Sequence, residues 1–394
     1  MPYRLEHIPM AERITVGIAL NGVTGRMGYR QHLVRSLLAI REQGGVERAD
    51  GSVIWPELTL VGRSADKLAA VAGRHGLDKV TTSLDEALND ESIDVYFDAL
   101  TTRHRLAAVN AAIKAGKHVY TEKPIATSLE DALSLARTAR DAGVKNGAVA
   151  DKLYLPGLRK LKRLVDSRFF GRVLSVRGEF GYWVFEGDWQ EAQRPSWNYR
   201  AEDGGGMVLD MFPHWSYLLE GTFGSPIKSV TAHVTTHIPE RFDEHGKAYA
   251  ATADDAAYAI FELVDGTVVQ MNSSWATRVD REELVEFHVD GTEGSAIAGL
   301  RKARAQHRAH TPKPVWNPDI DQPIPFRQQW HEVPDNEVFD NGFKLQWEEF
   351  LRHVVDDEPW HHDFMAAARG VQLAEAGYRS AREGRRIELE ELVL

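Results

Sequence analysis

The chain has 394 residues, a formal net charge of −11 and no cysteine. The acidic balance argues against a dedicated nucleic-acid-binding protein, which usually presents a basic face. The missing cysteines exclude disulfides, thiolate metal sites and a cysteine nucleophile. No apolar run approaches the ~20 residues of a membrane span, and the first residues lack the apolar core of a signal peptide. We therefore expect a cytoplasmic protein of about two domains, with neither a nucleic-acid nor a membrane partner.

Strand and helix signals alternate through the first 150 residues. Expected strands lie at 14–20, 58–61, 80–82, 95–100, 118–121 and 147–150, and expected helices at 26–42, 65–74, 84–89, 104–115 and 129–142. This alternation predicts βαβ units in a doubly wound parallel sheet of the Rossmann type, with ligands bound at the edge where the strands end. We assign residues 12–150 to this dinucleotide-binding domain.

The pattern changes after residue 150. A helix is expected at 159–167, followed by alternating strands at 173–182, 227–236, 256–263, 267–275 and 283–290. Asp265-Gly266 is a hairpin signal between two of these strands. The proline-containing stretch 303–330 is expected to be irregular. Residues 151–340 therefore form a second α/β domain with a mostly antiparallel open sheet, and helices at 343–356 and 363–382 close the chain over 341–394.

A glycine-rich turn follows the first strand and opens the first helix. Glycine permits a tight turn and a close approach of backbone N–H groups to a pyrophosphate, and the helix N-terminus adds a partial positive charge. The spacing G-x-x-G-x-x-G is a relaxed form of the dinucleotide fingerprint, found here in the expected strand–turn–helix context. The predicted cofactor contacts from this turn are Asn21, Gly22, Thr24, Gly25, Arg26, Met27 and Gly28.

The end of the second strand of a Rossmann domain reads the adenosine ribose. A carboxylate there favours NAD, and an arginine favours the 2′-phosphate of NADP. Here the strand is followed by Arg63 and Ser64, with Lys67 one turn later and no carboxylate before Asp66. This arrangement favours NADP, although Arg63 stacked on adenine is also compatible with NAD. Residues 44–57 are expected to be an insertion that lengthens the connection to this strand.

Two further segments carry groups suited to acid–base chemistry. Glu122-Lys123-Pro124 follows the fifth strand, so the lysine is expected at the ligand-binding edge, held against a carboxylate and able to bind a substrate hydroxyl. Asp210 and His214 follow three glycines and are four residues apart, which places both on one face of a helix. An imidazole there can take the proton of an alcohol, but a purely structural pair has the same spacing. No third ligand completes a metal site.

Together these features resemble the Gfo/Idh/MocA oxidoreductases over about residues 12 to 300 and in the closing helices. The resemblance rests on the glycine turn, on Ala115-Gly116-Lys117-His118-Val119 before Glu122-Lys123-Pro124, and on Gly204-Gly205-Gly206 before Asp210 and His214. It implies a nicotinamide cofactor and a sugar or polyol substrate. Lys123 would orient the reacting hydroxyl, His214 would be the general acid/base, and Asp210 would orient His214 or contact substrate. Thr101, His104, Glu122 and Lys123 would lie near nicotinamide. The resemblance also implies a homodimer or homotetramer formed through the antiparallel sheet.

Aromatic and basic residues gather in and around the segment that precedes Asp210. Aromatic rings suit the C–H faces of sugars, and arginines suit an anionic group on the substrate. Core packing or an interface is the alternative explanation for the aromatic residues. Arg103 and Arg105 after the fourth strand are further basic candidates. The predicted substrate contacts are Lys152, Tyr154, Trp183, Arg194, Trp197, Tyr199 and Arg200.

Three functions remain in competition. The first is an NAD(P)-dependent oxidoreductase that transfers hydride from a sugar, polyol or glycoside hydroxyl. The second is an NAD-dependent glycoside hydrolase that oxidises the sugar transiently, eliminates the aglycone, adds water and re-reduces the sugar, on an anionic glycoside such as a sulfoquinovoside. The third is a non-catalytic Rossmann protein, which the presence of Lys123, Asp210 and His214 disfavours.

Overall fold

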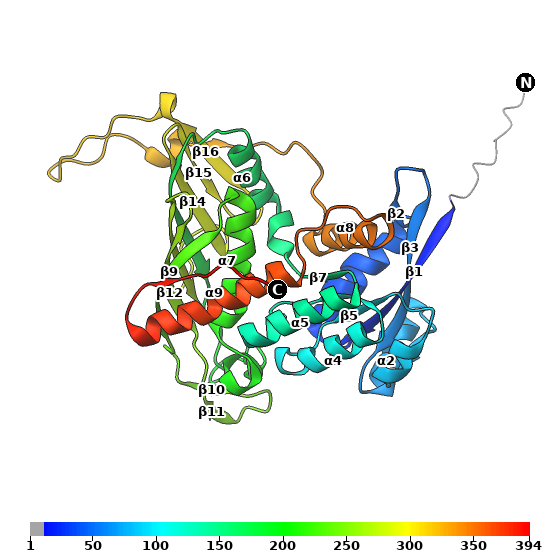
Figure 1. The fold of residues 1–394 in the computed structure, drawn as a ribbon. Coiled ribbons are helices and arrows are strands. Elements are labelled where there is room, and N and C mark those ends of the chain that lie inside the picture. Colours follow the sequence, from blue (N-terminus) through cyan, green and yellow to red (C-terminus); the bar gives the residue numbers. More distant parts are fainter. Residues whose placement is uncertain (1–11) are drawn as a thin grey trace, which may run out of the picture.

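The computed structural model describes residues 12–394, which form two domains side by side (Figure 1). The first domain is built on a mostly parallel sheet in which β4-β3-β1-β5-β6-β7 run in parallel, while β2 pairs antiparallel with β3. This is the strand order of a dinucleotide-binding Rossmann sheet, whose direction of winding reverses between β1 and β5. The strands are β1 (Arg13–Asn21), β2 (Val46–Glu47), β3 (Val53–Val61), β4 (Val80–Thr81), β5 (Val95–Asp98), β6 (His118–Thr121) and β7 (Asn146–Ala148).

Short helices connect these strands. Ser64, Ser83 and Ser128 each accept a hydrogen bond from a backbone N–H in the first turn of the helix that they precede, which satisfies a donor that the helix itself leaves free. The helix after the glycine turn begins at residue 26 as expected, and from Gly28 to Leu38 it has the wider turns of a π-helix. The helices are η1 (Gly28–Leu38), α1 (Ala39–Glu42), α2 (Ala65–His75), α3 (Leu84–Asn89), α4 (Thr102–Lys114) and α5 (Leu129–Ala142).

The second domain is built on a nine-stranded sheet with the order β17-β16-β15-β14-β8-β13-β12-β9-β18. Only β8 and β13 pair in parallel, so the sheet is mostly antiparallel as expected. The strands are β8 (Val173–Gly181), β9 (Ile227–Thr235), β12 (Ala256–Leu263), β13 (Val268–Ser274), β14 (Val285–Gly291), β15 (Gly294–Ala298), β16 (Ala303–His307), β17 (His331–Glu332) and β18 (Ile387–Glu388), and a separate hairpin is formed by β10 (Glu240–Phe242) and β11 (Ala248–Ala250).

The helical segments of this half of the chain are η2 (Asp151–Tyr154), α6 (Pro156–Asp166), η3 (Ser196–Tyr199), η4 (Ala201–Asp203), α7 (Met207–Phe223), η5 (Arg308–His310), η6 (Phe326–Gln329), α8 (Gly342–Asp356) and α9 (Phe364–Glu383). Helix α8 packs on η1, and its Trp347, Phe350 and Leu351 are buried in the core of the first domain. Helix α9 packs on α7, β9 and α5. The two closing helices therefore connect the domains.

Three sequence predictions need correction. The stretch 303–330 is not wholly irregular, because its first five residues form β16, and β15 was not expected at all. The second expected strand begins at Val53 rather than at residue 58, because the segment 44–57 contains β2 and the first half of β3, which form a hairpin. In each case, pairing with a neighbouring strand decided a segment whose own pattern is weak.

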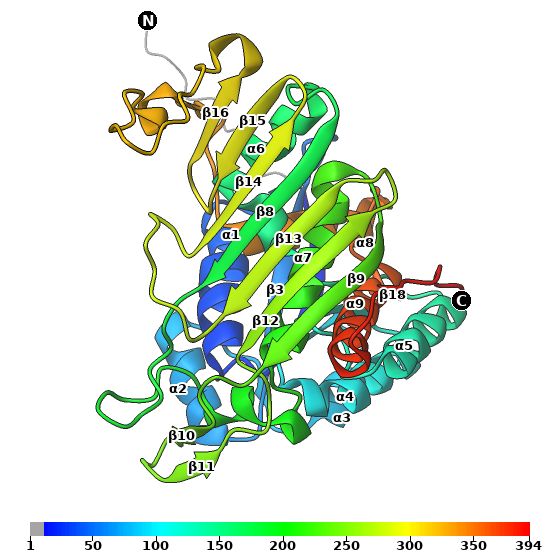
Figure 2. The ribbon, with the colours of Figure 1, turned by 90° about the vertical axis from the view of Figure 1, so that its left-hand side faces the viewer.

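One face of the large sheet carries the core of the second domain. Side chains of β12 alternate, so that Ala257, Ala259 and Phe261 are buried while Ile260 is exposed. Phe212 of α7 meets Phe261 edge-on, with ring centroids 5.3 Å apart. Figure 2 shows the sheet in front of α7 and α9, which cover this inner face, while the outer face remains open.

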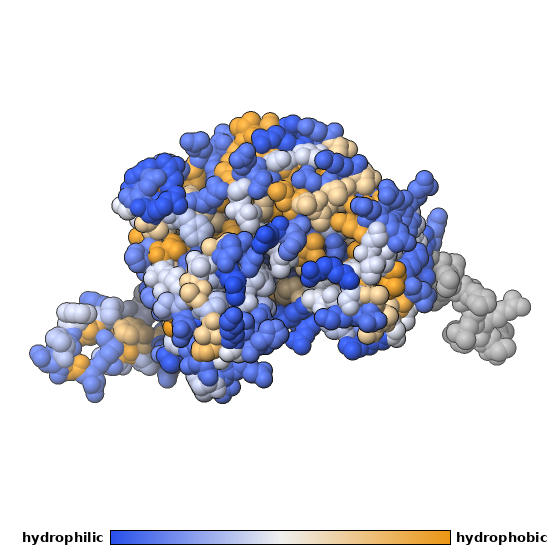
Figure 3. Space-filling view, turned by 90° about the horizontal axis from the view of Figure 1, so that it is seen from below, coloured by the Kyte–Doolittle hydropathy of each residue, from blue (hydrophilic) through white to orange (hydrophobic). Residues whose placement is uncertain are grey.

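No helix in residues 12–394 is long and apolar enough to cross a membrane. On the face seen in Figure 3, hydrophilic residues predominate and apolar residues form dispersed patches.

Candidate active site

Helix α7 carries the Asp–His segment, and its start is fixed by backbone contacts. Gly206 before the helix has a φ of +119°, and a Cβ there would lie 2.6 Å from Oδ1 of Asp254. Oδ2 of the same carboxylate accepts a hydrogen bond of 2.8 Å from the N–H of Val208. Glycine is therefore required where the chain enters α7, and Asp254 anchors the turn that carries Asp210.

Lys123 and Asp210 meet between the two domains. Lys123 follows β6, and its Nζ donates to the backbone carbonyl of Asp210 at 2.8 Å and also pairs with the Asp210 carboxylate. The other carboxylate oxygen of Asp210 accepts from Nη1 of Arg194 at 3.2 Å. Burial alone would raise the pKa of Asp210, but these two cations outweigh it and hold the pKa well below its usual range. Asp210 is thus a carboxylate held between two positive charges.

His214 lies one turn further along α7 and is 5% exposed. Its Nε2 is 3.1 Å from Nζ of Lys152, and its Nδ1 is 2.6 Å from the hydroxyl of Tyr217. Burial, with the nearby charges of Lys123 and Lys152, lowers the pKa of His214 well below its usual value, so the ring is neutral near pH 7. A neutral imidazole is the form that accepts a proton.

A buried hydrogen-bond chain holds the loop that bears Lys123. The indole N–H of Trp347 donates to Nδ1 of His32 at 3.0 Å, which leaves Nε2 of His32 to donate to Oε1 of Glu122 at 2.9 Å. Oε2 of Glu122 accepts from the backbone N–H of Lys123 at 3.2 Å. Burial raises the pKa of Glu122, but the bond from His32 and nearby cations bring it below its usual range. Glu122 therefore fixes the loop, while the side chain of Lys123 pairs with Asp210 rather than with this adjacent carboxylate.

The glycine turn forms a tight cradle between β1 and η1. Gly22 has a φ of +83°, and a Cβ there would lie 2.8 Å from backbone atoms of Ala99; a Cβ at Gly28 would lie 2.5 Å from the carbonyl oxygen of Gly22. Thr24, Gly25 and Arg26 are exposed at the tip of the turn. A turn with glycine at these three positions and an exposed tip lets backbone N–H groups approach the pyrophosphate of a dinucleotide.

The other predicted cofactor contacts occupy varied positions. The Asn21 amide donates to the Tyr96 hydroxyl at 2.9 Å and is buried, so it supports the turn from within. Arg63 and Lys67 are exposed beyond β3, and Met27 is half-buried at the start of η1. Two pairs bond locally: Ser64 caps α2 by accepting from the Lys67 N–H, and the Thr101 hydroxyl lies 2.9 Å from Nδ1 of His104 at the start of α4.

Of the predicted substrate contacts, Lys152 and Arg194 reach the site. Tyr154 does not, since its hydroxyl bonds to Glu349 and lies 3.4 Å from Nε2 of His362. Tyr199 is 2% exposed beneath Arg241, whose guanidinium carbon lies 3.8 Å from the ring centroid. These two tyrosines belong to packing rather than to the site.

Of the remaining members of that set, Trp197 lies in η3, and Trp183 and Arg200 lie on the loops around it. Arg278 stacks on Trp183 at 4.3 Å, and Arg200 stacks on Tyr249 at 4.5 Å. Trp197 is half-buried, and its carbonyl accepts from the Arg200 N–H at 3.2 Å. The aromatic cluster is thus largely engaged in stacking with the protein's own arginines.

Two family models match this chain. The model described as the oxidoreductase family with an NAD-binding Rossmann fold matches residues 18–149, and the GFO/IDH/MocA C-terminal domain matches residues 158–297. The chain belongs to the GFO/IDH/MocA oxidoreductase family. It is an enzyme that uses NAD or NADP as a hydride carrier, and the resemblance seen in the sequence is confirmed.

Individual relatives in the family agree with this assignment. The chain is 58% identical over 389 residues to the D-xylose dehydrogenase of Paenarthrobacter nicotinovorans, and this alignment covers 98% of this chain and 100% of that protein. It is 26% identical over 266 residues to the levoglucosan dehydrogenase of Pseudarthrobacter phenanthrenivorans, and this alignment covers 62% of this chain and 66% of that protein. The solved complex of a levoglucosan dehydrogenase with NADH and levoglucosan superposes with a TM-score of 0.77 at 19% identity, over 96% and 100% of the two chains, and shows the same fold.

Sequence reasoning missed two residues that lie beside His214 in the candidate site. Tyr217 lies three residues after His214 on the same helix, and this helical spacing is a signal that predicts contact. Asp151 directly precedes Lys152; its Oδ1 is 3.3 Å from the Tyr217 hydroxyl and 3.9 Å from Nδ1 of His214. Nothing in the sequence around Asp151 indicates that η2 lies against α7.

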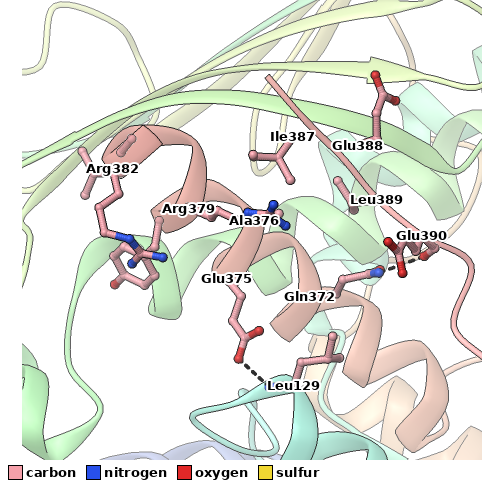
Figure 4. Close-up of a pocket in the computed structure, with 13 residues that line it drawn as sticks. Leu129, Gln372, Glu375, Ala376, Arg379, Arg382, Ile387, Glu388, Leu389 and Glu390 are labelled. Atoms are coloured by element: carbon pink, nitrogen blue, oxygen red, sulfur yellow. Dashed lines mark hydrogen bonds between the residues drawn. The ribbon is translucent and has the colours of Figure 1, made fainter. Parts of the chain in front are cut away.

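A cavity of about 800 Å³ lies elsewhere, between α9 and the C-terminal segment (Figure 4). Gln372 donates to the carbonyl of Glu390 across it at 2.8 Å, and Glu375 accepts from the N–H of Leu129 at 2.7 Å. It is lined by acidic and basic side chains together, and none of Lys123, Asp210 and His214 borders it. This cavity is therefore separate from the candidate active site.

Proposed function

We propose that this enzyme is an aldose dehydrogenase and that D-xylose is the first substrate to test. The observation that carries the proposal is the contact of Lys123, which follows the Rossmann strand β6, with Asp210, one turn before His214 on α7. The near-full-length identity to a D-xylose dehydrogenase supports the choice of sugar. A bound nicotinamide supplies the hydride acceptor.

The side chains have complementary roles in this proposal. Lys123, anchored by Asp210, donates a hydrogen bond to the reacting hydroxyl oxygen and stabilises the negative charge that develops on it. His214, neutral near pH 7, accepts the hydroxyl proton. The proton-transfer step is expected to contribute about 10²–10⁴-fold to the rate.

An uncharged sugar suits the site better than an anionic one. Arg194, the guanidinium nearest to Asp210, is already paired with that carboxylate and donates to the Tyr182 hydroxyl at 3.1 Å. Arg200 is stacked on Tyr249. A substrate carboxylate or sulfonate would have to displace these partners, which disfavours the hydrolase of anionic glycosides.

Cofactor preference and assembly complete the proposal. NADP is favoured, because Arg63 is exposed beyond β3 and no carboxylate stands at 62–65.

We propose a homodimer or homotetramer formed through the outer face of the large sheet, where Ile260 is 51% and Val268 44% exposed. Ile260→Glu should reduce the assembled mass measured by light scattering; an unchanged mass would exclude this face. The proposed compartment is the cytoplasm, where a dissociable nicotinamide cofactor is available.

The function is tested by incubating the purified protein with D-xylose, other aldoses, levoglucosan and aryl glycosides, each with NAD or NADP. Stoichiometric formation of reduced cofactor with an aldose supports the dehydrogenase. Release of aglycone with no net cofactor reduction would establish the glycoside hydrolase instead. No turnover on any compound would refute the proposed function.

The assigned roles are tested separately. Lys123→Ala and His214→Ala should each abolish turnover and leave cofactor binding, measured by fluorescence titration, largely intact. Lys114→Ala, which removes an exposed lysine at the end of α4, is the control and should keep full activity. Turnover retained by either site variant would remove that residue from the mechanism.

A further inference from the structure

We propose that Tyr217 and Asp151, rather than Asp210, orient His214 and stabilise its protonated form. They are positioning residues, because they act through the imidazole and not on the substrate. This inference rests on the proposed function, in which His214 is the base. It differs from the expectation that Asp210, one turn earlier on α7, orients the ring.

In the hydrogen bonds that link Asp151, Tyr217, His214 and Lys152, one assignment of donors and acceptors satisfies every contact. The Asp151 carboxylate can only accept, so it takes the O–H of Tyr217 at 3.3 Å. The Tyr217 oxygen is then free to accept Nδ1–H of His214 at 2.6 Å. Nε2 of His214 is left with its lone pair, which accepts from Nζ of Lys152 at 3.1 Å. This order places the ring proton on Nδ1 and the basic nitrogen on the side of Lys152.

Asp210 is engaged elsewhere. Both of its carboxylate oxygens are occupied, one by Lys123 and the other by Arg194. The hydrogen bonds of His214 in the described chain go to Lys152 and Tyr217. Although Asp210 and His214 are four residues apart on α7, their side chains serve different partners.

The charges around His214 show why a carboxylate other than Asp210 is needed to stabilise the protonated ring. Protonation of the ring places a positive charge beside the cations Lys123 and Lys152, and both lower the pKa of the imidazole. The neighbouring anions are Asp210, which is paired with Lys123, and Glu122, which is paired with His32. Asp151 lies 3.9 Å from Nδ1, closer to a ring nitrogen than any other carboxylate of the described residues, and its Oδ1 also lies 3.7 Å from Nζ of Lys152. Its charge, transmitted through Tyr217, makes proton acceptance by a buried base feasible.

The proton balance of the step is simple. A bound nicotinamide would accept the hydride from the substrate C–H. As the O–H bond of the substrate breaks, Nε2 would take the proton on the side where Lys152 now donates. The imidazolium then donates from Nδ1 to Tyr217, whose own O–H remains bonded to Asp151. After the carbonyl product leaves, Nε2 returns the proton to water. Asp151 borders an open groove of about 1000 Å³ but is itself buried, at 8% exposed.

The first test reads the ring directly and needs no turnover. In protein labelled with ¹⁵N at histidine, His214 should show the tautomer protonated at Nδ1, and its signals are identified by their loss in His214→Gln. Tyr217→Phe should abolish this single-tautomer signature. Tyr258→Phe is the matched control, because the Tyr258 hydroxyl also bonds a histidine, Nε2 of His237 at 3.1 Å, but on the outer face of the sheet. A ring protonated at Nε2 in the wild type would overturn the proposal.

The second test is kinetic. Asp151→Asn and Tyr217→Phe should each lower kcat about tenfold or more, with KM and cofactor affinity within about twofold of wild type. In Asp151→Asn the acid limb of kcat/KM should move to lower pH, because removal of the negative charge lowers the imidazole pKa. Unchanged kcat, or an acid limb that does not move, would overturn the proposal. If the wild type oxidises no sugar, the proposed function fails, and the tautomer measurement still decides this inference.

Discussion

Replacing Arg105 with methionine should destabilise the first domain severely. Arg105 and Asp98 are 2% and 0% exposed, and Nε of Arg105 donates to Oδ2 of Asp98 at 2.7 Å. The other guanidinium nitrogens donate to the carbonyls of Pro124 and Leu100, the latter at 2.6 Å. Arg105, proposed from the sequence as a possible anion-binding group, is thus a buried support beneath the Lys123 loop.

The expected cost follows from what is left behind. Removing one partner of a buried ion pair leaves an uncompensated charge and costs about 3–5 kcal/mol. Asp98→Asn made together with Arg105→Met removes that charge. The double variant should therefore recover about 2 kcal/mol relative to the sum of the single changes, the scale of coupling between contacting residues.

Urea unfolding followed by tryptophan fluorescence measures both quantities. Arg103→Met is the matched control, because Arg103 lies on the same helix with a side chain 64% exposed and meets Asp203 only at 3.4 Å. That change should cost less than about 1 kcal/mol. The reasoning is refuted if Arg105→Met costs no more than Arg103→Met, or if the single effects simply add.

Three further predictions concern pH, cofactor and backbone. Burial, together with the charge of His361, lowers the pKa of His362 from 6.5 to about 4. The neutral ring therefore contributes about 3 kcal/mol to the free energy of unfolding above pH 6.5, and this contribution is lost as the pH falls toward 4. His362→Gln should flatten the fall in unfolding free energy over that range, and an unchanged slope would contradict the prediction. Arg63→Ala should weaken NADP binding far more than NAD binding in titrations, whereas equal losses would mean that Arg63 only stacks on adenine. Gly22→Ala should destabilise the fold by about 1–3 kcal/mol and weaken cofactor binding. Gly51→Ala is the control, because Gly51 has the same φ of +83° but no atom within 4 Å of an added Cβ, and it should leave cofactor affinity unchanged. Similar losses of cofactor affinity in both variants would refute the steric argument.

Much of the architecture follows from local pattern. The alternation of apolar runs with helical segments before residue 150 predicts the Rossmann domain, and the glycine turn marks its cofactor edge, because both are readable within short stretches of chain. The period-2 strands after residue 173 predict the antiparallel sheet. The segment from β15 to β17 was not recognised, since its strands depend on pairing with one another.

In the candidate site too, some features follow from local sequence motifs and others from tertiary packing. The sequence by itself proposed Lys123, Asp210 and His214 as site residues, since each stands in a local motif whose chemistry can be recognised. Only the tertiary structure decided which groups they face. Asp210 bonds to Lys123, 87 residues earlier in the chain, and His214 bonds to Lys152, 62 residues earlier. Helical spacing indicates which side chains share a face, but the partner of a buried charge is set by the elements packed against that face, and no local pattern contains that information.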